Sequence, residues 1–211
     1  MNSQTSLNRP ISTPKQLLVE GRTAEIFFRE WIESTELKNE LQVRDFGSVS
    51  NLTGYLKVFT ALKDFREKVI TIGIVRDAEQ NSAASVFQSI CSSLTTVGLT
   101  PPAALNSTSE SPTRTAVFVL PDCDHSGMLE TLCWQVLQSD PKLGDQLKCV
   151  ADYLDCVRHK TRIRNETKAR IWTYFSGLGE FDPLLGHSAR AKKWDWACPA
   201  FAKLSSFLTA L

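Results

Sequence analysis

The chain lacks the apolar length that a membrane-spanning helix requires. None of its hydrophobic runs approaches the roughly 20 residues that cross a bilayer. Its polar beginning, Met1-Asn2-Ser3-Gln4-Thr5-Ser6, has neither the basic start nor the apolar stretch of a signal peptide. We therefore expect a cytoplasmic protein with no membrane partner.

Several chemical signatures are also missing. The six cysteines form no C-x-x-C pair and no zinc-like Cys/His spacing, which predicts reduced thiols, several of them buried, and argues against structural zinc. No P-loop, G-x-G-x-x-G or nucleophile elbow occurs, which argues against a self-contained nucleoside triphosphatase and a serine hydrolase. The net charge is only +1, so any nucleic-acid function must rest on a local patch.

What is present is an alternation of strand and helix patterns. With 211 residues, 42% of them hydrophobic, the chain can bury one sizeable core. The alternation predicts an α/β fold, with a four-stranded, mainly parallel sheet between helices. Strands are predicted at 16–19, 41–46, 69–75 and 115–120, and helices near 23–32, 52–63, 83–94 and 128–137.

The same patterns predict the domain organisation. We expect a flexible leader over 1–14, an α/β core over 15–140 and a C-terminal helical extension over 141–211 that packs on the core. Within the extension, helices are predicted over 143–157, 167–175 and 199–211, with a Gly/Pro-containing strap over 176–196. The turn-rich segment 98–115 predicts a mobile loop or a hairpin insertion, and the alternation in 41–46 predicts a strand exposed on one side.

Carboxylates follow two of the predicted strands. Glu20 comes directly after the first strand, and Asp77 and Glu79 follow the third. Because the carboxyl ends of parallel strands face one edge of the sheet, these acids are expected to meet there and to offer a site for a hard divalent cation. Taken singly, each acid is more typical of a helix N-cap or a solvated loop residue, and it is their combination that favours a metal site.

Three motifs in this order resemble the Toprim domain. They are Val19-Glu20-Gly21 opening a β-turn-α unit, Asp77-Ala78-Glu79 after a later strand, and Gly127-Met128-Leu129-Glu130 after the next one. Toprim domains occur in topoisomerases, primases, the overcoming-lysogenization-defect nucleases and the ribonuclease that matures 5S ribosomal RNA. The layout is most similar to small stand-alone Toprim-like families of unknown function. The resemblance covers most of 15–205 and implies a Mg- or Mn-dependent site acting on phosphodiesters.

The resemblance also implies residue roles. Glu20 matches the first-motif glutamate, a metal ligand or general acid/base, and Asp77 and Glu79 match the paired acids, with glutamate where aspartate is usual. Glu130 matches the later acid and is a fourth ligand candidate, directly or through water. Ala24 departs from the pattern, because many nuclease-type relatives carry an acid there, and Glu25 is turned away by a helical rotation of about 100°. Weaker candidates are Asp122, Asp124 and, as base or ligand, the loop residue His125.

A basic segment follows over 157–170. It holds six Lys/Arg residues against one acid and suits a phosphate backbone, although a solvated basic loop is an equally good interpretation. Lys168 is singled out because related nucleases place a lysine on a late helix, where it offsets charge in the transition state. Trp194 and Trp196 suit either base stacking or, more in keeping with large aromatics, packing of the strap. The nucleic-acid-binding candidates are Arg158, Lys160, Arg162, Arg164 and Lys168.

These observations lead to two hypotheses of different classes. The first is a metal-dependent nuclease or related phosphotransferase acting on DNA or RNA, with a possible partner ATPase. The second is a non-catalytic nucleic-acid-binding or regulatory module that works with a partner protein, which Ala24 favours because a nuclease acid is missing there.

Overall fold

The computed structural model describes residues 4–179 and 184–211 and is built around a four-stranded parallel sheet. The strands are β1 (Lys15–Val19), β2 (Leu41–Asp45), β3 (Thr71–Asp77) and β4 (Arg114–Leu120). They lie in the order β2-β1-β3-β4, and every neighbouring pair is parallel. The predicted α/β class and parallel sheet are therefore confirmed, and each strand overlaps its predicted range.

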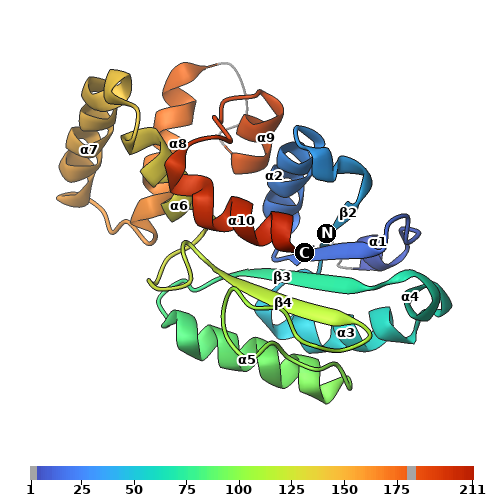
Figure 1. Ribbon diagram of the computed structural model, residues 1–211. Coiled ribbons are helices and arrows are strands. Elements are labelled where there is room, and N and C mark those ends of the chain that lie inside the picture. Colours follow the sequence, from blue (N-terminus) through green and yellow to red (C-terminus); the bar gives the residue numbers. More distant parts are fainter. Residues whose placement is uncertain (1–3, 180–183) are drawn as a thin grey trace.

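Helices cover both faces of this sheet. Helices α3 and α5 lie on one face, and α2, α9 and α10 lie on the other, with α6, α7 and α8 extending that second layer (Figure 1). The helices are α1 (Gln4–Leu7), α2 (Arg22–Glu33), α3 (Leu52–Ala61), α4 (Lys63–Lys68), α5 (Ala83–Thr96), α6 (Leu129–Gln138), α7 (Gly144–Arg158), α8 (Glu166–Leu178), α9 (Leu185–Arg190) and α10 (Ala202–Ala210). Short 3-10 turns occupy Glu36–Asn39, Val49–Asn51, Pro141–Leu143 and Pro199–Phe201. The single helix predicted over 52–63 is instead two, because Leu62 between α3 and α4 adopts an extended backbone.

The core divides into two clusters, one on each face of the sheet. Leu17 of β1 belongs to the cluster under α2 and α10, whereas its neighbour Leu18 belongs to the cluster over α3 and α5. Successive side chains of a strand point to opposite faces, so a strand covered on both sides must be apolar at both. This explains the nearly continuous apolar runs of β1 and β3.

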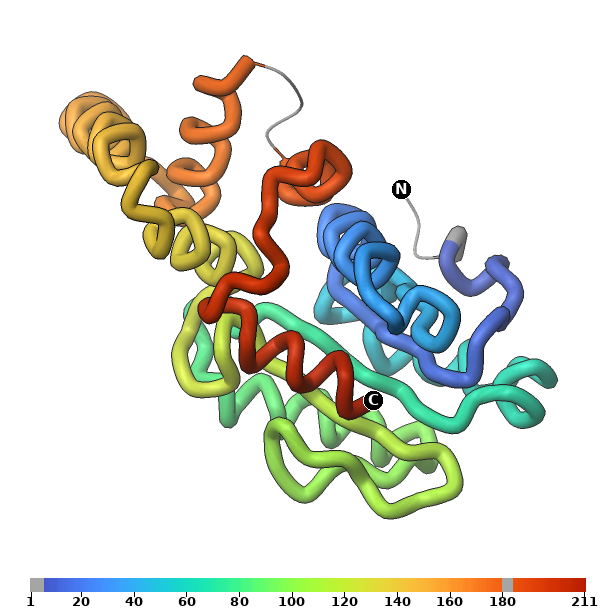
Figure 2. Tube along the Cα trace, turned by 45° about the horizontal axis from the view of Figure 1, so that its top comes forward, coloured from blue at the N-terminus to red at the C-terminus, as the bar shows by residue number. Residues whose placement is uncertain are grey.

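The C-terminal segment completes one of these layers. Helix α9 packs so closely on α2 that a Cβ added at Gly186 would lie 2.8 Å from the Cβ of Ile26. Leu211 packs on Gly73 of β3, where an added Cβ would lie 2.6 Å from a leucine methyl carbon. Figure 2 shows α10 running beside the sheet on the same side as α2. Residues 185–211 are thus part of the main core, and the predicted boundary near residue 140 does not separate two packing units.

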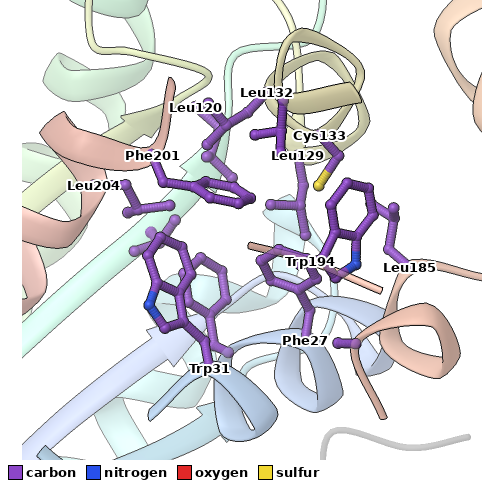
Figure 3. Packing of buried hydrophobic residues seen from close by; sticks show 14 of the residues in the cluster. Phe27, Trp31, Leu120, Leu129, Leu132, Cys133, Leu185, Trp194, Phe201 and Leu204 are labelled. Atoms are coloured by element: carbon purple, nitrogen blue, oxygen red, sulfur yellow. The ribbon is translucent and has the colours of Figure 1, made fainter. Parts of the chain in front are cut away.

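An aromatic cluster joins the strap to α2. The ring of Trp31 stacks on that of Trp196 with centroids 4.9 Å apart, and Phe27 contacts Trp194 edge-on at 6.0 Å. Figure 3 shows Phe27, Trp31, Trp194 and Phe201 gathered in one cluster. The packing role of both strap tryptophans is therefore confirmed. Helix α9 within the strap was not predicted, because its short apolar face becomes visible only against α2.

The leader differs from the prediction of a flexible segment. Its described part, 4–14, packs against β2, and Ile11 is only 3% exposed. The guanidinium of Arg44, fully buried on β2, donates to the backbone oxygens of Ser6 (2.7 Å) and Pro10 (2.8 Å). The prediction that β2 is exposed on one side is likewise wrong, because the leader covers that side.

Three smaller predictions concern the cysteines, the turn-rich segment and membrane helices. All six cysteines are free, and Cys123, Cys133 and Cys198 are buried, as predicted. The segment 98–115 forms a short antiparallel bridge from Thr108 to Ala116 on β4, which matches the hairpin interpretation. Across the described residues, no helix combines the length and the hydropathy of a membrane span.

Candidate functional site

A cavity of about 330 Å³ lies at the carboxyl edge of the sheet, where β1 and β3 end and α6 begins. Four acids that were predicted to meet, together with the predicted lysine, line this cavity. They are Glu20, Asp77, Glu79, Glu130 and Lys168. The other lining residues are Gly21, Arg22, Thr23, Ala24, Gly47, Ser48, Leu129, Trp172, Leu184 and Leu185.

The turn after β1 fixes Glu20 at this edge. Gly21 has φ +84°, a conformation that side chains other than glycine's rarely adopt, so the turn into α2 requires a glycine. Its N–H donates to Asp45 Oδ1 at 2.8 Å, and the same oxygen accepts the N–H of Gly47 at 2.6 Å. Asp45 therefore ties the loops after β1 and β2 together. Sequence reasoning missed Asp45, although an aspartate two residues before a glycine is a known turn signal.

Asp77 lies at the end of β3 and faces the start of α6. Its Oδ1 accepts the N–H of Leu129 at 2.9 Å. Burial, followed by the negative charge of Glu130, raises the pKa of Asp77 from 3.8 to about 7, even though the hydrogen bond from Leu129 opposes the shift. Near neutral pH this carboxyl is therefore divided between its protonated and ionised forms.

Glu20 has an unsatisfied oxygen. Its Oε2 is buried without a hydrogen-bond partner, and the Arg76 Nε that lies 3.7 Å away is also buried and unpartnered. Burial raises the pKa of Glu20, while Arg76 opposes the shift. A buried polar atom left without a hydrogen bond costs about 1–3 kcal/mol, so the Glu20 oxygen favours a further ligand in the cavity. Arg76 was missed by sequence reasoning, although a charged residue inside an apolar strand is a signal.

Glu130 and Lys168 lie close together in the cavity lining. Lys168 Nζ lies 3.8 Å from Glu130 Oε1, and burial raises the pKa of Glu130. Asn165 caps α8 through its Oδ1, which accepts the N–H of Lys168 at 2.9 Å. The lysine is therefore held in the first turn of α8, with 41% of its side chain exposed.

Glu79 lies at the rim of the cavity. It is exposed and has φ +52°, and its N–H donates to the backbone oxygen of Gly127 at 2.6 Å. This contact joins the loop after β3 to the loop that leads into α6. Glu79 thus contributes a backbone tie as well as a solvent-facing carboxylate.

The other predicted basic residues do not line the cavity. Arg158 pairs with Asp155 at 3.4 Å and with Glu166 at 2.9 Å. Lys160, Arg162 and Arg164 are exposed between α7 and α8. Of the predicted nucleic-acid contacts, Lys168 alone reaches the acids. A role of the other four in nucleic-acid binding stays a prediction.

The weaker candidates also lie outside this cavity lining. His125 Nδ1 lies 2.8 Å from Asp122 Oδ2, and Asp124 pairs with Lys203 at 2.5 Å. These contacts form an exposed loop network. We therefore assign no site role to the three predicted substitutes, Asp122, Asp124 and His125.

The departure at Ala24 is visible in the cavity wall. The alanine lines the cavity, while the side chain of Glu25 is 2% exposed and pairs with Arg9 and Arg22. The rotation expected along a helix is thus confirmed, and Glu25 does not replace the missing acid.

The carboxylates that line the cavity have the chemistry that a hard divalent cation requires, but they are not arranged as a complete ligand set. Four carboxylates, of which Glu20 has an oxygen without a hydrogen-bond partner, offer the oxygen ligands that Mg²⁺ and Mn²⁺ prefer. Within residues 4–179 and 184–211, however, no three His, Cys, Asp or Glu side chains already stand close enough to hold a metal ion together. The acids come from the ends of β1 and β3 and from the start of α6, and they line one cavity.

Comparison with known proteins places the chain in a family. Neither the curated proteins nor the solved structures contain a match to it. A family model described as "Protein of unknown function (DUF3226)" matches residues 14–211, which is nearly the whole chain. The chain therefore belongs to the DUF3226 family.

Proposed function

We propose that this protein is a Toprim-like, Mg- or Mn-dependent nuclease or related phosphotransferase that acts on nucleic-acid phosphodiesters. One observation carries the proposal: Glu20, Asp77 and Glu130 come from separate elements and line one cavity with Lys168, although their charges repel and burial disfavours them. Carboxylates are rarely gathered in this way without a cationic ligand.

The acids would hold the cation. Glu20, Asp77 and Glu130 would supply oxygens from the walls and Glu79 from the rim, with waters completing the shell, as Mg²⁺ prefers. The bound cation would supply Lewis-acid polarisation of a phosphoryl oxygen and an activated water. Asp77 would release its proton when the cation binds, because ligating carboxylates must be ionised.

Lys168 would act on the substrate side. Its 3.8 Å separation from Glu130 is longer than a hydrogen bond, so its ammonium donors remain available to a phosphate oxygen. In that position the lysine would offset the charge that develops on the phosphoryl group. Arg76 would keep Glu20 ionised by facing its carboxylate from the strand side.

The test is a cleavage assay with Mn²⁺ on single- and double-stranded DNA and RNA. We expect Asp77→Asn to lower the rate about 100-fold or more, since catalytic electrostatic groups commonly contribute that much. Asp64→Asn, in an exposed i,i+4 pair on α4, is the matched control and should leave the rate unchanged. Equal rates for Asp77→Asn and wild type, or cleavage that persists in EDTA, would contradict the proposal.

The second candidate is a non-catalytic nucleic-acid-binding or regulatory module. It is favoured by the methyl group of Ala24 in the cavity wall and by the separated acids of the described residues. Such a module would bind nucleic acid without cutting it and would work with a partner protein. In either case six free thiols suit the reducing cytoplasm, where we place the protein.

A further inference from the structure

Trp172 is unusual among the tryptophans of this chain. It is 45% exposed, whereas Trp31, Trp134 and Trp194 are 2%, 7% and 5% exposed. Tryptophan is highly buried on average, because its ring carries a large apolar area. The ring of Trp172 therefore costs solvation free energy where it lies, and packing of the core does not explain its position.

The position of Trp172 links it to the acidic cavity. It lines the cavity together with Lys168, and both belong to α8. Two residues four positions apart on a helix have their side chains on the same face, and they are separated by about 6 Å along the axis. An exposed indole thus stands one turn from the lysine proposed to contact phosphate, at a spacing comparable with the span from a phosphate to its base.

We infer that Trp172 is a stacking platform for an unpaired nucleobase beside the phosphodiester in the cavity, so that the site takes single-stranded nucleic acid. This inference rests on the proposed function and specifies its substrate class. Every base offers a π-face, so stacking tolerates any sequence. In a duplex those faces are covered by neighbouring base pairs. A stacking site therefore selects against double-stranded nucleic acid.

The surroundings favour a base over the apolar side chain of a protein partner. Lys168 and the proposed cation would supply positive charge in the same cavity, so an occupant that also contacts Trp172 must be apolar at one end and anionic at the other. A nucleotide has this combination, with a flat ring joined to an anionic phosphate. Leu184 and Leu185 add apolar surface to the lining of the same cavity.

The first measurement is fluorescence anisotropy with labelled oligonucleotides of about 12 nucleotides, the scale of a single-strand binding site. The probes are oligo-dT, oligo-rU, an abasic strand of equal length and a duplex, each in Mg²⁺ and in EDTA. We expect Trp172→Ala to weaken binding of dT and rU about 5- to 100-fold, the range for loss of one stacked base, with no change for the abasic strand. Comparison of dT with rU separates DNA from RNA as the source of the base.

Two further variants make this result specific to stacking. Trp172→Phe keeps an aromatic face and should retain most of the affinity. Tyr153→Ala removes an aromatic ring that is 57% exposed on α7 and should behave as wild type. Equal affinities of wild type and Trp172→Ala for dT and rU, or an equal loss for the abasic strand, would overturn the inference.

The second measurement separates the inference from the proposed function. Quenching of tryptophan emission by oligo-dT or oligo-rU should occur in wild type and be lost in Trp172→Phe, whether or not a strand is cut. Quenching without Mn²⁺-dependent cleavage would support the stacking platform and contradict the nuclease. Mn²⁺-dependent cleavage that is unaffected by Trp172→Ala would support the nuclease and contradict the stacking platform. Absence of binding, quenching and cleavage would contradict both.

Discussion

Two regions of this protein bury charge, and they do so in opposite ways. On β2, the guanidinium of Arg44 is fully buried, and it donates to backbone oxygens of the leader and to Gln16 Oε1 at 2.6 Å. It also lies 5.2 Å from the ring centroid of Phe59. At the carboxyl edge of the sheet, Glu20 Oε2 has no hydrogen-bond partner and the pKa of Asp77 is raised to about 7.

The difference separates a structural charge from a functional one. A buried ion whose donors are all hydrogen-bonded holds together the segments that supply the acceptors. Removing the ion leaves those acceptors without hydrogen bonds. Buried ions that repel one another weaken the fold and persist where a ligand compensates for them. By this criterion Arg44 is a structural charge that holds the leader in place, and the cavity acids fit the metal site that we propose.

The largest expected effect is on the structural side. Arg44→Leu should lower the free energy of unfolding by about 3–5 kcal/mol, as removal of a buried, fully hydrogen-bonded ion does. Urea denaturation measures this change, and limited proteolysis should show cleavage within the leader. Arg66→Leu replaces an exposed arginine on α4 and is the control. If the two variants have equal stability, the leader is held by other contacts and the comparison breaks down.

A smaller effect of opposite sign is expected at the cavity. Without divalent cations, Asp77→Asn should raise the free energy of unfolding by about 1–3 kcal/mol near pH 8, since it removes a buried charge next to other carboxylates. Because the folded pKa is about 7 and the ordinary value is 3.8, the contribution of Asp77 to stability is complete below about pH 4 and is lost as the pH rises through 7.

The measurement for this prediction is urea denaturation of wild type and Asp77→Asn in EDTA at several pH values. The stability gap should widen between about pH 5 and pH 8, and millimolar Mn²⁺ should stabilise wild type only. A gap that does not change with pH, or a wild type indifferent to Mn²⁺, would place Asp77 with the structural charges. Asp64→Asn again provides the control.

The smallest effect concerns the basic residues outside the cavity. Changing Arg162, Arg164 and Lys168 together to glutamine should flatten the dependence of nucleic-acid affinity on salt, because fewer counterions are released on binding. Comparison with Lys168→Gln alone shows how much of the slope belongs to the two exposed arginines. Equal slopes for the triple variant and wild type would remove these residues from the interface.

Local patterns were sufficient to predict the sheet and the acids at its edge. β1 and β3 are buried on both faces, so each contains a nearly continuous apolar run, and the acids at their ends must lie at the shared carboxyl edge. The motif resemblance added Glu130 and Lys168, which local patterning does not distinguish from surface residues. All of these side chains line the same cavity.

Contacts between distant segments could not be predicted in the same way. Arg44 occupies a polar position of an alternating strand, and the leader, 34 to 38 residues away, helps to make that position an interior one. The partnership of Arg76 with Glu20 and the placement of α9 on α2 likewise depend on the assembled fold. Periodicity reports which faces are apolar, but it does not report which segment covers them.

The most direct test of the central claim is an anomalous difference map from crystals soaked in Mn²⁺ near pH 8, where Asp77 is ionised. Our account predicts a peak in the cavity, coordinated by at least two of Glu20, Asp77 and Glu130, and absent from crystals of Asp77→Asn. An empty cavity in wild-type crystals, or the same peak in both proteins, would contradict the claim that these carboxylates form a metal site.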